Sequence, residues 1–160
     1  MASAYDPHPD REYACIRNSA ALIDVSPLYK YWITGRDAMR LIDRTITRDM
    51  TKLKPGQVYY TPWCDGEGKV IDDGTVSRLD DTTYRLTSAD SSLRWLRMNA
   101  VGLEVKIEDI SECVGTLSIQ GPLSRAILSQ ASPADLAGLK YFRLVDSTVR
   151  GIPVNISRTG

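Results

Sequence analysis

The sequence predicts an α+β fold in which helices flank antiparallel sheets. Helical and strand-like segments alternate along the chain, and three strand-like runs in its middle are joined by short links, as in an antiparallel meander. The length of 160 residues and the hydrophobic content of 42% are sufficient for one domain, or two small ones, with a sizeable core. We therefore expect the helices to pack on one face of a sheet built largely from consecutive strands.

The first third of the chain is predicted to contain two helices with a strand between them. Residues 10–22 carry apolar side chains at helical spacing, and Asp10 is placed to cap that helix. Residues 29–34 alternate like a strand, which Gly35 ends. Residues 37–46 then have the pattern of a second helix. One side of this second helix carries the residues expected in the core: Ala38, Leu41, Ile42 and Thr45.

The middle of the chain is predicted to form the meander and to return to it. Residues 57–64, 69–78 and 83–88 are strand-like and form antiparallel hairpins. Residues 90–101 form a helix, and residues 103–110 a further strand. The expected cap of this helix is Asp90 or Ser91, and its expected core positions are Leu93, Leu96 and Val101.

The last third is predicted to contain a strand, a helix and a final hairpin. Residues 113–120 form the strand and residues 121–129 the helix. Residues 141–149 and 152–158 are two strands that turn at Arg150-Gly151.

These elements suggest a division into two subdomains. Residues 37–110 contain both the meander and two helices, and we expect them to form an α+β subdomain. Residues 1–36, together with residues 111–160, form a second and incomplete subdomain in this interpretation.

Charge and hydropathy exclude several classes of partner. Twenty basic and twenty acidic residues cancel, so the electrostatic attraction that nucleic acids and acidic membranes exert on basic proteins is absent. No apolar run has the length of a membrane span, and the N-terminus lacks a basic region followed by an apolar core. We expect a cytoplasmic protein.

The cysteines and the single histidine limit the chemistry. Cys15, Cys64 and Cys113 are widely spaced and odd in number, which predicts reduced thiols and no zinc site. His8 lies between two prolines near the N-terminus, which disfavours a catalytic triad or a multi-histidine metal centre. Acid–base work then falls to carboxylates or tyrosines, and no metal is expected.

The most informative local feature is the pair Asp72-Asp73 between apolar residues. Aspartate is depleted in strands and is rarely buried without a partner, so the pair requires a turn or a ligand. Adjacent strand side chains point to opposite faces, so only one of the two carboxylates can enter a pocket. The residues alone leave two alternatives open: a solvated Asp-Asp-Gly turn, or a functional site.

Seven short motifs in a fixed order resemble one protein family. They are Ala21-Leu22-Ile23-Asp24-Val25-Ser26, Gly35-x-Asp37-Ala38, Leu53-x-Pro55-Gly56-Gln57, Tyr60-Thr61, Val70-Ile71-Asp72-Asp73, Ile119-Gln120-Gly121-Pro122 and Ser157-Arg158-Thr159-Gly160. Each is weak alone, but seven in register are specific. The chain from about Arg11 to Gly160 resembles the aminomethyltransferase family, which includes the T-protein of the glycine cleavage system and its tetrahydrofolate-dependent relatives.

The resemblance implies an N-terminal part of the T-protein folate-binding fold and tetrahydrofolate as cofactor. The family's proteins are more than twice this length, so the resemblance implies a truncated form that binds folate poorly. It assigns Asp73 as the catalytic carboxylate beside the folate amines, and Asp72 as structural. It places Tyr60 against the flat pterin, although one tyrosine of Tyr59-Tyr60 inside the core and one outside is an alternative.

Two positions depart from the family's pattern at the folate site. Leu28 stands where a methionine near the pterin is common, and Ala89 where T-proteins carry an asparagine. Asp90 or Ser88 could replace the lost amide contact, or Asp90 could only cap the following helix. These departures favour a tetrahydrofolate-dependent demethylase as a competitor of a glycine cleavage component.

The function that the resemblance implies is transfer of a methylene or methyl group from a small substrate to tetrahydrofolate. The implied partners are folate, a small amine or methyl donor and, for the glycine cleavage branch, a lipoyl carrier protein. The alternative from another class is a non-catalytic folate-binding module of the iron–sulfur assembly or tRNA-modification type. The one-carbon donor is not specified by the sequence.

Overall fold

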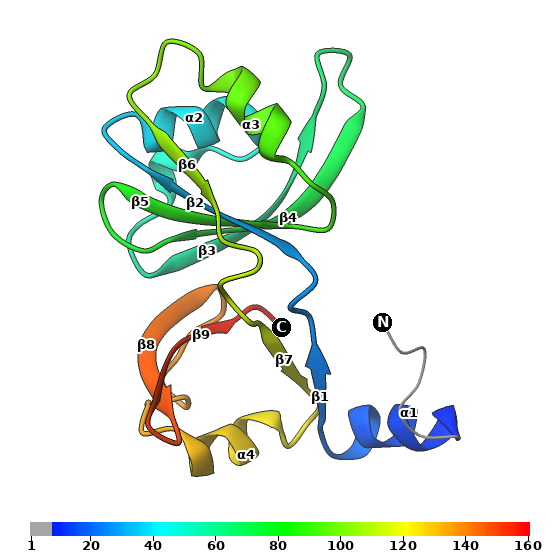
Figure 1. Ribbon diagram of the computed structural model, residues 1–160. Helices are drawn as coiled ribbons and strands as arrows, with labels where there is room; N and C mark the ends of the chain where they lie inside the picture. Colours follow the sequence, from blue (N-terminus) through cyan, green and yellow to red (C-terminus); the bar gives the residue numbers. More distant parts are fainter. Residues whose placement is uncertain (1–7) are drawn as a thin grey trace.

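The computed structural model describes residues 8–160, and these form two parts stacked end to end (Figure 1). The helices are α1 (Pro9–Asn18), α2 (Ala38–Thr45), α3 (Leu93–Asn99) and α4 (Ser124–Ala131), with the short 3-10 helix η1 (Met50–Lys52). The strands are β1 (Ala21–Asp24), β2 (Tyr29–Thr34), β3 (Gln57–Cys64), β4 (Val70–Arg78), β5 (Thr83–Ser88), β6 (Lys106–Asp109), β7 (Leu117–Gln120), β8 (Arg143–Val149) and β9 (Ile152–Arg158).

The strands form a seven-stranded sheet of order β6-β2-β5-β4-β3-β8-β9 and a two-stranded sheet of β1 and β7. Every pairing is antiparallel, and β3, β4 and β5 form the meander that the sequence predicts. The α+β class with antiparallel sheets flanked by helices is therefore confirmed.

We call residues 29–110, which contain β2 to β6 with α2 and α3, the two-layer half. Both helices cover one face of its sheet (Figure 1), and the core lies between the two layers. The four residues predicted for the inner side of α2 are all buried there. They pack with aromatic and aliphatic side chains from the strands, including Tyr31, Ile33, Trp63, Val76, Tyr84 and Leu86.

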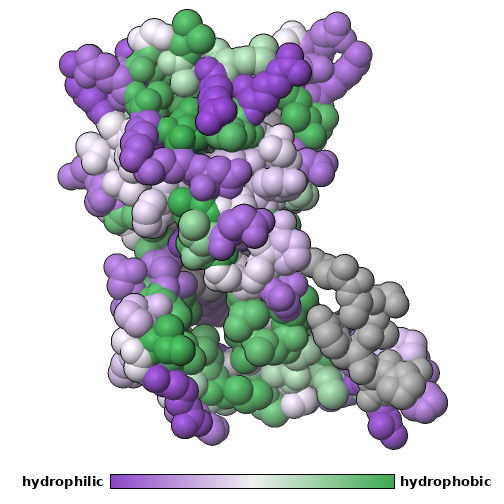
Figure 2. Space-filling view, in the orientation of Figure 1, coloured by the Kyte–Doolittle hydropathy of each residue, from purple (hydrophilic) through white to green (hydrophobic). Residues whose placement is uncertain are grey.

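We call residues 8–28 and 111–160 the open half. It contains α1, β1, β7, α4 and the β8–β9 hairpin, which joins the large sheet through the pairing of Gln57 with Arg143. Neither α1 nor α4 contains a buried residue. Figure 2 shows hydrophobic side chains at the surface of this half, and the exposed apolar residues there include Leu22, Leu117, Leu123 and Ile127.

The predicted division into subdomains at residue 37 stays a prediction. Strand β2, at residues 29–34, pairs with β5 and β6 of the two-layer half, although it precedes that boundary. None of the helices in residues 8–160 has the length and apolar character needed to cross a bilayer.

Several predicted element boundaries are wrong at the ends of the two-layer half and in the open half. The helix predicted over 10–22 ends at Asn18, because residues 21–24 pair with β7 as a strand, and its N-cap is His8 rather than Asp10. The N-cap of α3 is Ser92 rather than Asp90 or Ser91. Val101, expected in the core, is 78% exposed because α3 ends before it.

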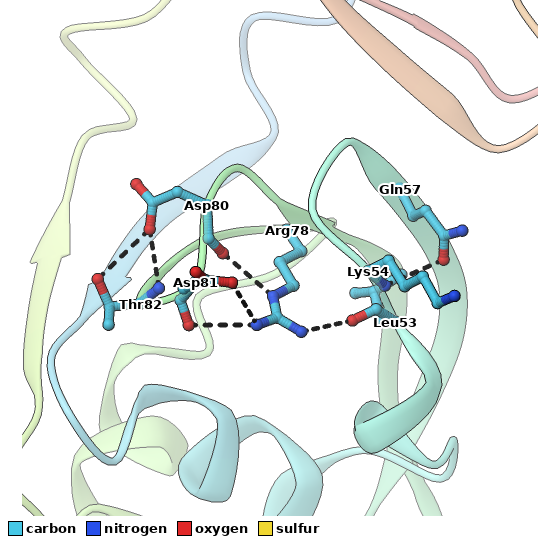
Figure 3. Close-up of polar contacts among 7 residues, drawn as sticks. All are labelled: Leu53, Lys54, Gln57, Arg78, Asp80, Asp81 and Thr82. Atoms are coloured by element: carbon cyan, nitrogen blue, oxygen red, sulfur yellow. Dashed lines mark hydrogen bonds and ion pairs between the residues drawn. The ribbon is translucent and has the colours of Figure 1, made fainter.

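The turn between β4 and β5 is anchored by one arginine (Figure 3). The Arg78 guanidinium donates to the Leu53 carbonyl at 2.7 Å and to the Asp80 carbonyl at 3.1 Å. The Asp80 carboxylate accepts from the Thr82 peptide N–H at 2.8 Å, and this hydrogen bond is the largest effect that lowers the pKa of Asp80. This end of the hairpin is thus fixed by main-chain contacts, and the opposite end of β4 carries the candidate site.

Candidate functional site

The Asp72-Asp73 pair lies inside strand β4. Asp72 pairs with Trp63 and Asp73 with Pro62 of β3. The ladder continues through Gly74, which pairs with Thr61 on one side and Ser88 on the other. The alternative of a solvated Asp-Asp-Gly turn is therefore wrong, because all three residues are part of a continuous strand.

Gly74 allows two strands to approach closely next to Asp73. A Cβ atom placed on Gly74 would lie 1.9 Å from the main-chain oxygen of Thr87 on β5. No side chain fits into that space, so β4 can pass β5 at this point only with glycine. The glycine after the carboxylate pair is thus required for the close packing of β4 against β5.

The two carboxylates lie on opposite faces of the sheet. Residues that are paired across antiparallel strands share a face, so Asp72 lies on the face of the buried Trp63, toward the helices. Asp73 lies on the other face, together with Pro62 and Tyr60. This face is turned away from α2 and α3.

Asp73 and Tyr60 are joined by a hydrogen bond. The Tyr60 hydroxyl donates to the Asp73 carboxylate atom Oδ2. This hydrogen bond is the largest effect that raises the pKa of the Tyr60 phenol, followed by burial and by the negative charge of Asp73. Within residues 8–160 no hydrogen-bond donor contacts the other oxygen of Asp73, and Tyr60 is 52% exposed. Tyr59, in contrast, packs against the core.

Asp72 fixes the chain segment after β5. Its carboxylate accepts from the peptide N–H of Asp73 at 2.7 Å and from that of Asp90 at 3.0 Å. The Ser88 hydroxyl donates to the carbonyl of Asp90 at 2.8 Å. The side chain of Asp90 is exposed.

Leu28 lies at the same end of the sheet as Asp73. Tyr29, Ser88, Gly74 and Thr61 are paired in one row across four strands. Leu28 and Asp73 each precede a member of this row by one residue, so both lie just beyond it, at the sheet's end. The side chain of Leu28 is half-buried.

Lys30 holds the turn that carries Leu28, although it is not among the site residues expected from the sequence. Its side chain is 1% exposed, and its ammonium donates to the carbonyls of Ser26 at 2.8 Å and of Leu28 at 2.7 Å. Burial is the largest effect on this ammonium and lowers its pKa, against the charge of Glu112 and other nearby carboxylates. A lysine within the otherwise aromatic and aliphatic run 29–33 was the available signal.

A hollow of about 230 Å³ lies on the same sheet face, where the two halves meet. Its walls are formed by Trp32, Leu79, Arg85, Leu144, Asp146 and Asn155. The Arg85 guanidinium donates to the Asn155 side-chain oxygen at 2.8 Å and so links β5 to β9. Burial lowers the pKa of Arg85, and the Asp146 carboxylate opposes that effect.

The family of the chain follows from its sequence profile. The profile described as the GCVT N-terminal domain matches residues 1–160. The chain belongs to this family.

Full-length relatives of this family are considerably longer than the chain. An aminomethyltransferase of Thermoanaerobacter sp. (strain X514) is 36% identical over 154 residues, which are 93% of this chain and 42% of that protein. The aminomethyltransferase of Bacillus subtilis (strain 168) is 32% identical over 155 residues, or 94% of this chain and 42% of that protein. The chain thus spans about 42% of the length of these curated relatives.

Solved structures show the same fold. The glycine cleavage system aminomethyltransferase T from Bartonella henselae superposes with a TM-score of 0.73 at 21% identity, over 86% of this chain and 38% of that one. The heterotetrameric sarcosine oxidase from Corynebacterium sp. U-96 superposes with a TM-score of 0.68 at 18% identity, over 88% of this chain and 71% of that one. At these identities the likeness concerns the fold.

Proposed function

We propose that this chain forms part of a tetrahydrofolate-dependent one-carbon transferase, in which Asp73 is the catalytic carboxylate and Tyr60 a wall of the folate site. The observation that carries the proposal is the Tyr60–Asp73 hydrogen bond on the sheet face away from the core. Membership of the family and the aminomethyltransferase names of its relatives supply the reaction class. Methylene or methyl transfer from a small substrate to tetrahydrofolate is the reaction proposed.

The residues at this end of the sheet suit a flat, partly polar ring system. Tyr60 offers an exposed aromatic ring for stacking, and Leu28 a half-buried apolar side chain. Asp73 offers a carboxylate oxygen that accepts no hydrogen bond from residues 8–160. Tetrahydrofolate, when bound, supplies the amine nitrogen that accepts the one-carbon unit. Asp90, two residues beyond the end of β5, is the further residue proposed to contact it.

Asp73 can stabilise positive charge and carry a proton. A carboxylate facing a nitrogen on which positive charge develops lowers the energy of that charged state, and it can accept the proton that is released. Tyr60 keeps the carboxylate in place, since its hydroxyl holds Oδ2, and Oδ1 accepts no hydrogen bond from residues 8–160. Asp72 positions the neighbouring segment through the Asp90 peptide N–H.

The donor is proposed as a small molecule that carries a methyl or aminomethyl group, and the reaction is proposed to take place in the cytoplasm. A lipoyl carrier protein is the proposed partner if the donor is that of glycine cleavage. Residue 89 is an exposed alanine, so no amide is present there to contact a pterin. The non-catalytic folate-binding module remains the alternative that an activity measurement separates.

The test is transfer of a labelled one-carbon unit to added tetrahydrofolate by the protein as the cell expresses it. We expect Asp73→Asn to reduce transfer on the order of 10²- to 10⁴-fold, because the carboxylate charge and its proton acceptor are lost. Asp81→Asn is the matched control, since its side chain is 89% exposed at the other end of β4. Transfer by Asp73→Asn at the rate of the unchanged protein would refute the catalytic role.

A further inference from the structure

Two threonines lie beside the Tyr60–Asp73 pair on the same sheet face. Thr75 of β4 pairs with Tyr60 of β3 and with Thr87 of β5, and Thr87 pairs with Lys30 of β2. Paired residues share a face, so Lys30, Thr87, Thr75 and Tyr60 form one row across four strands. Alternation along β4 places this row on the face of Asp73, two residues away.

The hydroxyls of the two threonines are the unused polar groups of this row. At one end of the row Tyr60 is bonded to Asp73, and at the other end Lys30 is bonded to main-chain carbonyls. Thr75 and Thr87 are half-buried, yet neither hydroxyl makes a hydrogen bond with residues 8–160. Some polar side-chain atoms are fully buried and have no hydrogen-bond partner, but neither threonine hydroxyl is one of them. Both hydroxyls therefore keep some surface that solvent can reach.

The row also lies between two other polar features of the face. On one side is Asp73, and on the other is the row of Trp32, Arg85 and Ser77, of which the first two line the hollow where the halves meet. A ligand that contacts Asp73 and extends toward this hollow must cross Thr75 and Thr87.

We propose that Thr75 and Thr87 are specificity-determining residues that hydrogen-bond the polar edge of the ring system bound against Asp73. This inference rests on the proposed function. A threonine hydroxyl both donates and accepts, so it can pair with a ring N–H or with a ring nitrogen or oxygen. Valine has nearly the same shape but offers neither contact. The hydroxyls therefore favour a flat heteroaromatic ligand with a polar edge over an apolar ring of the same size.

The test uses Thr75→Val and Thr87→Val in the protein as the cell expresses it, with tetrahydrofolate as the probe. We expect each substitution to raise the Kd for tetrahydrofolate about two- to ten-fold, the loss of one neutral hydrogen bond. The melting temperature is expected to stay unchanged, because neither hydroxyl makes a hydrogen bond with residues 8–160. Thr34→Val is the matched control: it lies on the same face of β2, is half-buried, and pairs with Thr83 at the other end of the sheet.

The outcomes separate this inference from the function on which it rests. If the unchanged protein binds tetrahydrofolate and both valine variants bind it equally well, the specificity role is overturned while the proposed function stands. If the variants melt at lower temperature and keep their affinity, the hydroxyls are structural and the inference is again overturned. If the unchanged protein does not bind tetrahydrofolate, the proposed function and this inference both fail.

Discussion

The two halves of the molecule differ in how they bury apolar side chains. In the two-layer half, Leu41, Ile42, Trp63 and Leu96 are all 1% exposed or less, between the sheet and its two helices. In the open half, neither α1 nor α4 contains a buried residue. Leu22, Leu117 and Ile152 of that half are each more than 60% exposed.

This difference explains why the backbone at the candidate site is held in a fixed position. Asp73 and Tyr60 project from β4 and β3, whose opposite face packs on the core, so the core fixes the backbone that carries them. The open half contributes Asn155 and Asp146 to the hollow where the two halves meet, and Asn155 accepts a hydrogen bond from Arg85 there.

The largest expected difference between the halves is in the cost of truncating a leucine. Leu41→Ala, at a fully buried site on α2, should lower the free energy of unfolding by about 3 kcal/mol, because it removes packed atoms and leaves a cavity. Leu123→Ala, at a site that is 47% exposed in the open half, should change it by less than about 0.5 kcal/mol. Urea unfolding of both variants gives the comparison. Equal losses would mean that the open half contributes as much packing as the two-layer half.

A smaller effect is expected where β4 passes β5 beside the site. Gly74→Ala should destabilise the protein by about 2 kcal/mol, since its Cβ would lie 1.9 Å from the Thr87 oxygen and force the strands apart. Gly66→Ala is the matched control, because no atom lies within 4 Å of a Cβ placed there. Thermal unfolding of the two variants measures the difference. A Gly74→Ala protein as stable as Gly66→Ala would show that the strands are not in close contact.

The smallest effect is a shift in the titration of Tyr60. Its raised pKa means that the hydrogen bond to Asp73 stabilises the fold below tyrosine's ordinary pKa of about 10, and that this contribution is lost as the pH rises through the raised value. Asp73→Asn should lower the pKa of Tyr60 toward that ordinary value. Ultraviolet absorbance titration measures it, with Tyr60→Phe to identify the signal. An unchanged Tyr60 titration in Asp73→Asn would contradict the contact.

Local pattern was sufficient to predict strands β2 to β5 of the two-layer half. β2, β3 and β5 have the predicted bounds, and β4 begins one residue later than predicted, because alternation is a local signal. Strand β1 was not predicted. Its residues Leu22 and Ile23 pair with β7 almost a hundred residues later, and no local periodicity records such a pairing.

The candidate site was predictable only in part. The paired carboxylates, and the resemblance of the motif around them, indicated Asp73 and Tyr60. That the two residues contact each other depends on the register of β3 against β4. Lys30, Thr75 and Thr87 share their row through two such registers, which one sequence does not specify.

A crystal structure of the protein as expressed, with tetrahydrofolate bound, tests the central claim most directly. We expect the ring system on the sheet face away from α2 and α3, against Tyr60 and within hydrogen-bonding distance of Asp73. Tetrahydrofolate bound on the helix-covered side would contradict the claim. An example is the groove on α3 that is lined by Arg94, Arg97 and Met98.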